Sequence, residues 1–445
     1  MRIFTRFHMY IKKFFLILFI LLFADNQLVL ADKEPEITLK QAVRNVLKTH
    51  PTILAEKAYK KAVDRAADIT RANLFPSVDI SLGGGYQEYR YQDSSLSQNN
   101  DYLLRNEQSL TLSQLLFDNF STSNKVKAAH NQAQAAQNSV LHTSEEIAMK
   151  AVEAFFNVLL YRKHIEVITK NISDHEKIFN RINTQYNIGT GTLADVQQAQ
   201  LKLATAQTEL IEQQLSLESA VAVYKEIFNE LPKKLIMPER PQIEDIENEA
   251  QLIEMALLNN KKINTLSKQI EAKKAELNSA KALYSPTLTL DLSAVRNENQ
   301  PNFDDSTIDY RAMLNMKFNI FRGFADKSKI KEAQENLTYA EFKKKEYIRE
   351  VKANVKKYFH MFRASSLRLP LLRENVQTNL ILLESYMEQF DMGKRNLLAL
   401  LDARDELSEN IITLLNSQID YMLSYFRILA VTNRLLVTLQ ITIIS

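Results

Sequence analysis

The chain of 445 residues contains no cysteine and has little glycine or proline. The absence of cysteine excludes disulfides, thiolate nucleophiles, cysteine-ligated metal centres and lipid attachment to an N-terminal cysteine. Seven glycines and nine prolines make up roughly 4% of the residues, where about 12% is usual. We therefore expect long helices and no glycine-rich phosphate-binding loop.

The first 31 residues have the features of a secretory signal peptide. A basic start precedes an unbroken apolar run from Phe14 to Phe23, and small residues stand before a cut after Ala31. The run is too short to span a bilayer as a helix, which needs about 20 residues, and an uncleaved anchor is the alternative. The segment carries the whole net charge of +3, so the mature chain gives no electrostatic case for nucleic acid.

The rest of the chain contains one unit twice. Pro76 and Pro286 stand in similar segments 210 residues apart, and a Phe-x-x-Phe motif begins at Phe117 and again, 204 residues later, at Phe321. The sequence thus predicts a first repeat at 32–231, a proline-containing linker at 232–250 and a second repeat at 251–445.

Long segments without glycine or proline predict long helices in each repeat. They cover 121–187 and 192–231 in the first repeat, and 325–391 and 394–438 in the second, where Pro370 predicts a kink. A further helix begins each repeat. Because a helix of 67 residues is about 100 Å long, it needs partners along its length.

Apolar residues recur every three or four positions from Val196 to Ile227, and only Gln213 interrupts them. This spacing predicts a coiled-coil seam. The last helix has two such stripes, which predicts a neighbour on each side, as in a ring of helices; a simple antiparallel pair is the alternative.

Two hairpins with alternating polar and apolar residues are predicted at 77–117 and 287–321. Strands of about ten residues cross a bilayer when tilted. Phenylalanines stand at the strand exits, as in the aromatic girdles of membrane barrels: Phe117, Phe120, Phe321 and Phe324. The edge of a soluble sandwich is the alternative.

Four strands cannot close a barrel, so the chain is expected to assemble. A dimer would supply eight strands and a trimer twelve. Polar residues that face the barrel lumen, Asp79, Asp291 and Lys317, favour a water-filled barrel and hence the trimer. The predicted fold is mainly α with β, a long α-helical barrel below a shared 12-stranded β-barrel.

These features together resemble the TolC family of outer-membrane efflux and type I secretion channels. The resemblance rests on Pro76 and Pro286, on the Phe-x-x-Phe strand exits, and on the helix-joining turns 186–199 and 390–403. It covers essentially the whole mature chain. Each motif is weak alone, but the motifs occur in order, twice, at matched spacing.

The resemblance implies a passive homotrimeric duct from the periplasm through the outer membrane of a Gram-negative bacterium. Its periplasmic tip would be closed at rest and opened by a periplasmic adaptor and an inner-membrane pump of the ABC or RND type. The turns around Gly189, Gly191 and Gly393 would contact the adaptor. No cofactor, metal or enzymatic activity is implied.

The resemblance also assigns residues to the tip aperture. Arg395 and Asp402 match the second turn, and Asp195 matches the first. Phe390 stands where the best-known member has a tyrosine, so a hydroxyl contact is lost, and Ala399 replaces the outer of two aspartates.

Asp402 is followed on the same helix face by Asp405 and Glu409. We predict that the acidic ring is displaced inward, with Asp402 and Asp405 at the constriction, where three copies would raise one another's pKa and select cations. A merely solvated stripe is the alternative for Asp405 and Glu409. Arg395 and Asp195 are predicted to form a closing ion pair.

Two other classes of function compete with the duct. A periplasmic adaptor also has long helical hairpins, but the duplication and the low glycine content oppose it. No residues in the sequence support an enzyme. The string from Gly189 to Ala194 reads G-x-G-x-x-A, as in dinucleotide-binding sites, but it follows a helix instead of a strand. The missing cysteine excludes the lipid-anchored branch and so favours the protein-export and multi-pump branch, without separating type I secretion from drug efflux or naming the cargo.

Overall fold

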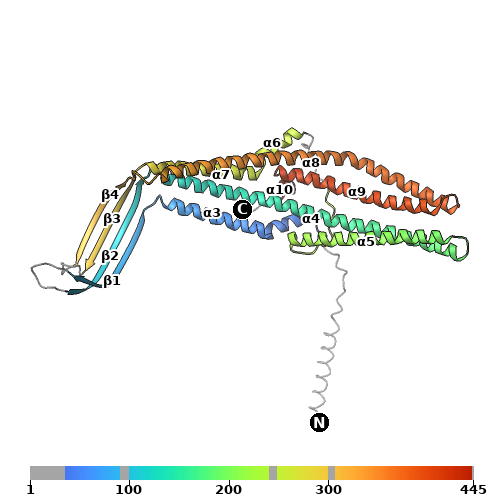
Figure 1. Ribbon diagram of the computed structural model, residues 1–445, viewed down its shortest axis with the longest axis horizontal. Coiled ribbons are helices and arrows are strands. Elements are labelled where there is room, and N and C mark those ends of the chain that lie inside the picture. The colour runs from blue at the N-terminus through green and yellow to red at the C-terminus, as the bar shows by residue number, and fades with distance from the viewer. Residues whose placement is uncertain (1–35, 91–99, 240–247, 299–305, 443–445) are drawn as a thin grey trace, which may run out of the picture.

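The computed structural model describes residues 36–90, 100–239, 248–298 and 306–442. The predicted signal peptide lies outside these ranges. The molecule is elongated, with a four-stranded sheet at one end and two helix-joining turns at the other (Figure 1). None of the described helices has the length and hydropathy needed to cross a membrane.

The helices are α2 (Leu39–Thr49), α3 (Pro51–Ala72), α4 (Ser121–Asn187), α5 (Leu193–Phe228), α6 (Glu249–Asn259), α7 (Lys261–Lys281), α8 (Ala325–Asp391), α9 (Leu397–Val431) and α10 (Leu435–Thr438). The strands are β1 (Ser77–Arg90), β2 (Asn100–Phe117), β3 (Thr287–Glu298) and β4 (Thr307–Lys317).

The strands form one antiparallel sheet in the order β1-β2-β3-β4. The hairpins of the two repeats therefore lie side by side through β2 and β3. Within the described ranges, β1 and β4 each have a partner on one side only. The four strands confirm the sequence analysis, and the two open edges match the expectation that the chain cannot close a barrel alone.

The strand bounds correct one detail of the prediction. The second hairpin ends at Lys317 instead of 321, because Lys317 pairs with Thr287 and the preceding Pro286 has no N–H to extend the ladder. Strand β2 begins at Asn100, within the predicted hairpin 77–117, because its pairing with β1 continues to Arg90.

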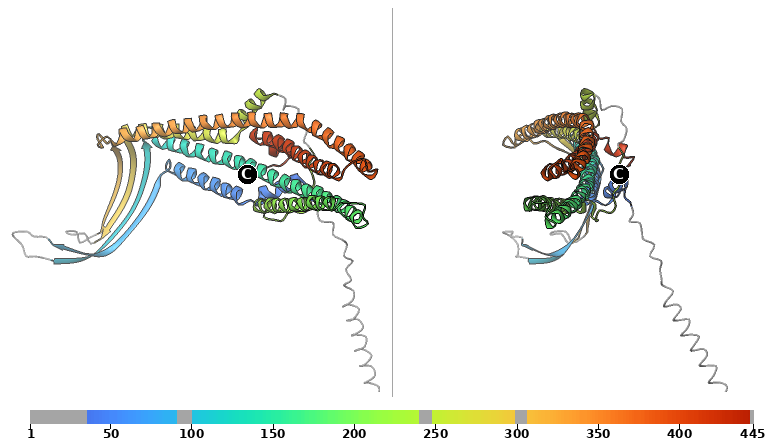
Figure 2. Two further views of the ribbon diagram at one scale, coloured as in Figure 1. Left: turned by 45° about the vertical axis from the view of Figure 1, so that its right-hand side comes forward. Right: turned by 90° about the vertical axis from the view of Figure 1, so that its right-hand side faces the viewer.

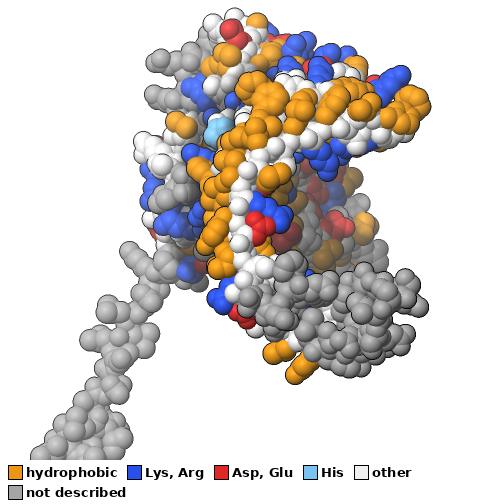
Figure 3. Space-filling view, turned by 90° about the vertical axis from the view of Figure 1, so that its left-hand side faces the viewer, with side chains coloured by type: hydrophobic (Ala, Val, Ile, Leu, Met, Phe, Trp, Pro, Cys, Tyr) orange, Lys and Arg blue, Asp and Glu red, His pale blue; other side chains and the backbone are white. Residues whose placement is uncertain are grey.

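The register separates a polar from an apolar face of the sheet. Asp79 lies opposite Thr111, which lies opposite Ser293. On the other face, Ile80 and Leu292 are exposed in the single chain. Viewed from the sheet end of the molecule, hydrophobic side chains form a continuous run over the surface (Figure 3). Three of the seven glycines, at 83–85, lie in extended strand β1 and form no phosphate-binding loop.

The duplication is visible in the backbone. Phe120 and Phe324, 204 residues apart, both adopt a left-handed conformation directly before a 67-residue helix, with φ of 62° and 65°. Gly189 and Gly393 end these helices with φ of 80° and 69°. Equivalent positions thus start and stop equivalent helices. Helix α8 runs unbroken through Pro370.

Several predicted helices are shorter or interrupted. The first helix of each repeat is divided in two, and the side chains of His50 and Asn260 cap the second pieces, α3 and α7. The predicted helix 394–438 breaks after Val431, because Asn433 is left-handed with φ of 58°, and resumes as α10. Helix α5 ends before left-handed Asn229 instead of at 231.

The predicted linker is partly built into the fold. Lys234 accepts a backbone hydrogen bond from Ile37, and Leu235 is buried. Helix α6 already begins at Glu249, inside the predicted linker range.

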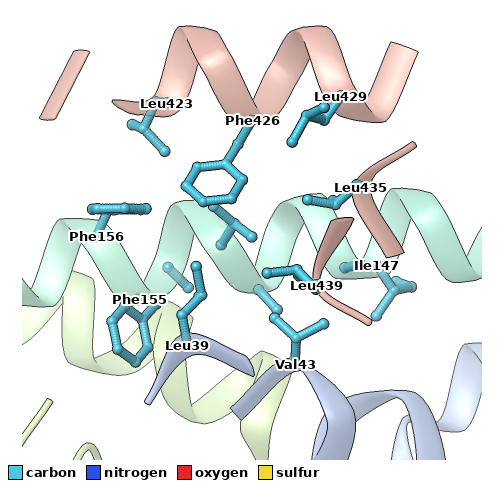
Figure 4. Packing of buried hydrophobic residues seen from close by; sticks show 14 of the residues in the cluster. Leu39, Val43, Ile147, Phe155, Phe156, Leu423, Phe426, Leu429, Leu435 and Leu439 are labelled. Carbon is cyan, nitrogen blue, oxygen red and sulfur yellow. The ribbon is translucent and has the colours of Figure 1, made fainter. Parts of the chain in front are cut away.

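The largest hydrophobic core lies midway along the helices. Phe156 of α4 meets Phe426 of α9, with 5.7 Å between the ring centroids, and Phe155 lies in the same cluster. Leu39 of α2 and Leu435 of α10 complete this cluster (Figure 4). Each fully buried side chain of this size contributes about 1.5–3 kcal/mol, so the core fixes the short elements against the long ones.

Toward the turn end, the helices lie in the order α5-α4-α9-α8, with α4 packed on both α5 and α9. Helix α9 therefore has a neighbour on each side, as its two stripes predicted. Viewed along their length, the helices form a curved layer instead of a closed bundle (Figure 2).

Candidate functional site

The candidate site lies at the end farthest from the sheet, where α4 turns into α5 and α8 turns into α9 (Figure 1). Glycine is required at position 191 because the backbone of Tyr186 lies close to it. A Cβ there would be 3.0 Å from the backbone nitrogen of Tyr186. Gly189 and Gly393 are required by their positive φ. The two turns are therefore compact and locally determined.

Apolar side chains join the two turns to each other. Ala199 of α5 and Ile182 of α4 are buried against Leu397 and Leu401 of α9, with Phe390 packed beside them. The structure thus places Phe390 in a hydrophobic contact at the end of α8.

The predicted ion pair between Arg395 and Asp195 is absent from the described chain. The guanidinium of Arg395 lies 3.8 Å from the ring centroid of Tyr386. Asp195 instead accepts a hydrogen bond of 2.6 Å from the hydroxyl of Thr192, which caps α5. Both side chains have local partners because each stands in the first turn of a helix or just before it. A contact between copies stays a prediction.

The acidic residues of α9 take part in a network that spans three helices. The Nζ atom of Lys202 on α5 lies 2.8 Å from a carboxylate oxygen of Asp402 and 2.8 Å from one of Asp405. The Nε2 atom of His175 on α4 lies 2.8 Å from the other oxygen of Asp405. We call these four residues the tip network.

Contacts within one chain determine the pKa shifts in the tip network. Burial acts to raise the pKa of Asp405, but hydrogen bonds from His175 and Lys202 outweigh it and hold the pKa below its usual range. Burial also opposes the charge of Lys202, yet its two carboxylate partners raise its pKa. Within one chain, a cation and an imidazole thus determine the direction of the shift, and the repulsion between three copies stays a prediction.

Further charged side chains of α4, α5 and α9 lie beside the tip network. Asp174 forms ion pairs with Arg404 across the α4–α9 contact and with Lys177 on its own helix. Glu209 on α5 has a raised pKa, first through burial and then through repulsion by Asp405, Glu212 and Glu409. The cationic side chains of Arg404, Lys177 and Lys202 thus partly neutralise the carboxylates at this end of the molecule.

Sequence reasoning missed His175 and Lys202. A signal was present for His175: His164, Ile168, Asn171, His175 and Ile182 follow a coiled-coil spacing along α4, and all five are buried. His164 pairs with Gln213, the one polar residue of the α5 seam, at 3.1 Å. No signal identified Lys202, because its partners lie about 200 residues away.

At the opposite end, the four strand-exit phenylalanines are all between 45% and 70% exposed. The rings of Phe321 and Phe324 meet edge to face with 5.5 Å between centroids. Such exposure of large apolar rings suits contact with a further surface, and their role as a girdle stays a prediction. Within the described ranges, no cluster of side chains is placed to hold a metal ion.

Comparison with known proteins agrees with this geometry. A family model described as "Outer membrane efflux protein" matches residues 42–225 and 252–433, one segment in each repeat. The outer membrane efflux protein BepC of Brucella suis is 21% identical over 89% of this chain and 86% of its own length. The outer membrane protein TolC of Vibrio cholerae is 22% identical over 85% and 86%.

The fold matches a solved outer-membrane channel. The crystal structure of the Campylobacter jejuni CmeC outer membrane channel superposes with a TM-score of 0.79, at 14% identity, over 89% of this chain and 86% of that one. At this identity the likeness shows the fold. The alternative of a periplasmic adaptor finds no support in these matches.

Proposed function

We infer that this chain, which belongs to the outer membrane efflux protein family, forms the outer-membrane exit duct of an efflux or type I secretion system in a Gram-negative bacterium. The observation that carries this inference is a sheet with one apolar face and two open edges, attached to helices of 67 residues. A helix of that length is about 100 Å long and reaches far from the membrane.

The duct is a homotrimer. Strand β4 of one copy pairs with β1 of the next, so that three sheets close a barrel of twelve strands. Closure satisfies the backbone groups that the open edges would leave unpaired in lipid. The polar face of the sheet, with Asp79, Asp291 and Lys317, lines the lumen, and the strand-exit phenylalanines lie at the membrane interface.

The turn end is the periplasmic gate. An adaptor contacts the turns around Gly189, Gly191 and Gly393, and an inner-membrane pump of the ABC or RND type supplies the energy. The tip network holds α9 against α4 and α5 within each copy. The gate opens when the adaptor binds an arrangement in which these helices separate.

Engineered cysteines test the trimer, because the chain has none of its own. Ser81→Cys on β1 is combined in turn with cysteine at each position from Arg311 to Asn315 on β4. Oxidation is expected to produce dimer and trimer bands for at least one register. The control pair is Thr111→Cys with Ser293→Cys, which lie opposite each other on β2 and β3 of one chain. Its oxidation should link no two chains and should leave a monomer band. Monomers for every β4 position, with threefold particles absent in electron micrographs, would refute the trimer.

A further inference from the structure

A pocket of about 290 Å³ lies between α4 and α9, and Leu380 of α8 also lines it. Its volume is close to the lower end of the range for small-ligand sites, about 300–1,000 Å³. The lining residues on α4 are Lys163, Glu166, Val167, Lys170 and Asn171, and those on α9 are Arg404, Leu407, Ser408, Ile411 and Leu415.

Two buried polar atoms of this pocket have no partner. Asn171 is 5% exposed and its Oδ1 atom accepts no hydrogen bond, while Ser408 is 7% exposed and its Oγ atom has no bond. Each such group costs about 1–3 kcal/mol when left unsatisfied. On the same seam of α4, His164 and His175 both reach a partner on a neighbouring helix. Asn171 therefore differs from them, because its buried Oδ1 atom has no partner although the residue lines the pocket.

The charges around the pocket are unequal. Lys163 is paired with Glu166 at 2.7 Å, and Arg404 is paired with Asp174. Lys170 has no carboxylate within ion-pairing distance among the described residues. One cation is thus left over at the pocket, beside an apolar wall formed by α9.

We propose that this pocket binds a small amphiphile with a single anionic head group. The head group pairs with Lys170, and the apolar body lies on Leu407, Ile411 and Leu415. Ser408 donates its hydroxyl to the ligand. Asn171 Oδ1 accepts a hydrogen bond from a donor on the ligand or from a water that the ligand holds.

The position of the pocket leaves it open in an assembly. It lies within one chain, in the middle of the layer α5-α4-α9-α8, so a second copy meets the outer helices. These helices carry the exposed apolar residues expected of such contacts, for example Ile211 on α5 and Leu371 on α8, which are 66% and 62% exposed. The proposal therefore does not depend on the trimer or on channel activity.

The pocket also adjoins the tip network. Asn171 precedes His175 by one helical turn, and Ser408 follows Asp405 by three residues. A bound amphiphile would contact the same two helices that the His175–Asp405 contact joins.

Decanoic acid carrying a photoreactive diazirine on its chain provides the probe. The full-length mature protein is held in detergent-free nanodiscs, labelled under light, and digested for mass spectrometry. Labels are expected in the peptides that contain 163–171 and 404–415, and competition with unmodified decanoate should remove them. The neutral decanol analogue should label these peptides much less.

Matched variants decide the assignment. Lys170→Glu should weaken labelling at least about tenfold, since a charge-assisted contact becomes repulsive. Lys127→Glu makes the same change at an exposed position of the same helix and should label as the wild type does. Ser408→Leu fills the pocket and should abolish labelling. Equal labelling of wild type and Lys170→Glu, or labels confined to the strands, would overturn the proposal.

Discussion

His175 Nε2 lies 2.8 Å from Asp405 Oδ1, although 230 positions separate the two residues. The histidine belongs to the first repeat and the aspartate to the second. The histidine side chain is fully buried and the aspartate side chain is 36% exposed. The contact therefore joins the two repeats near the tip, at a point where one partner has no access to water.

Removing the imidazole should loosen the tip. His175→Phe keeps a ring of similar size but leaves Asp405 with Lys202 as its partner. We expect a loss of roughly 1–2 kcal/mol in the free energy of unfolding and a higher resting conductance in planar bilayers. His130→Phe, at an exposed position of the same helix, is the control. Unchanged conductance in His175→Phe would remove the histidine from the gate.

Acid should weaken the tip network through Asp405. Its folded pKa lies below its usual value, so the stabilisation is present above about pH 4, the ordinary pKa, and is lost as pH falls through the folded value. Melting temperatures between pH 6 and pH 3 should therefore fall less steeply in Asp405→Asn than in the wild type. Parallel curves would contradict this, and solvent exposure of the carboxylate keeps the expected difference small.

A buried glutamate should make the protein less stable at high pH. Glu145 on α4 is 4% exposed and lies near the N–H of Leu436, and burial raises its pKa to about 8. The contribution of Glu145 to the free energy of unfolding is fully present below its unfolded pKa near 4.5. It declines by about 1.4 kcal/mol per pH unit up to pH 8.

Glu145→Gln should accordingly be more stable than the wild type at pH 8 and similar to it at pH 4.5, as measured by chemical denaturation. Glu146→Gln serves as the control, since its side chain is 58% exposed. A stability gap independent of pH would show that Glu145 does not titrate in this range.

The first turn should be sensitive to a single methyl group. In Gly191→Ala, the new Cβ would meet the backbone of Tyr186 at 3.0 Å, so the turn must shift. The amides of 190 and 191, which bond to the carbonyl of Gln185, should exchange hydrogen faster. Gly85→Ala on β1 meets no atom within 4 Å and should leave these amides unchanged. Equal protection in Gly191→Ala and the wild type would show that the turn tolerates the side chain.

Much of the architecture could be predicted from local pattern. The spans 121–187 and 325–391 match α4 and α8 residue for residue, because the Phe-x-x-Phe motifs and the glycines mark their ends. The breaks at His50, Asn260 and Asn433 were missed. Each uses a side chain or a left-handed residue within an otherwise helical composition, which composition alone does not reveal.

The sequence by itself determined the duplication, the bounds of the two 67-residue helices, the four strands and the acidic positions Asp402 and Asp405. These follow from spacing, which acts over a few residues. Only the tertiary structure decided that His175 and Lys202 face these aspartates, that Arg395 lies on Tyr386, and that Asn171 faces a pocket. Such contacts depend on how α4, α5 and α9 are placed side by side, and no local pattern encodes which residue of one long helix meets which residue of another.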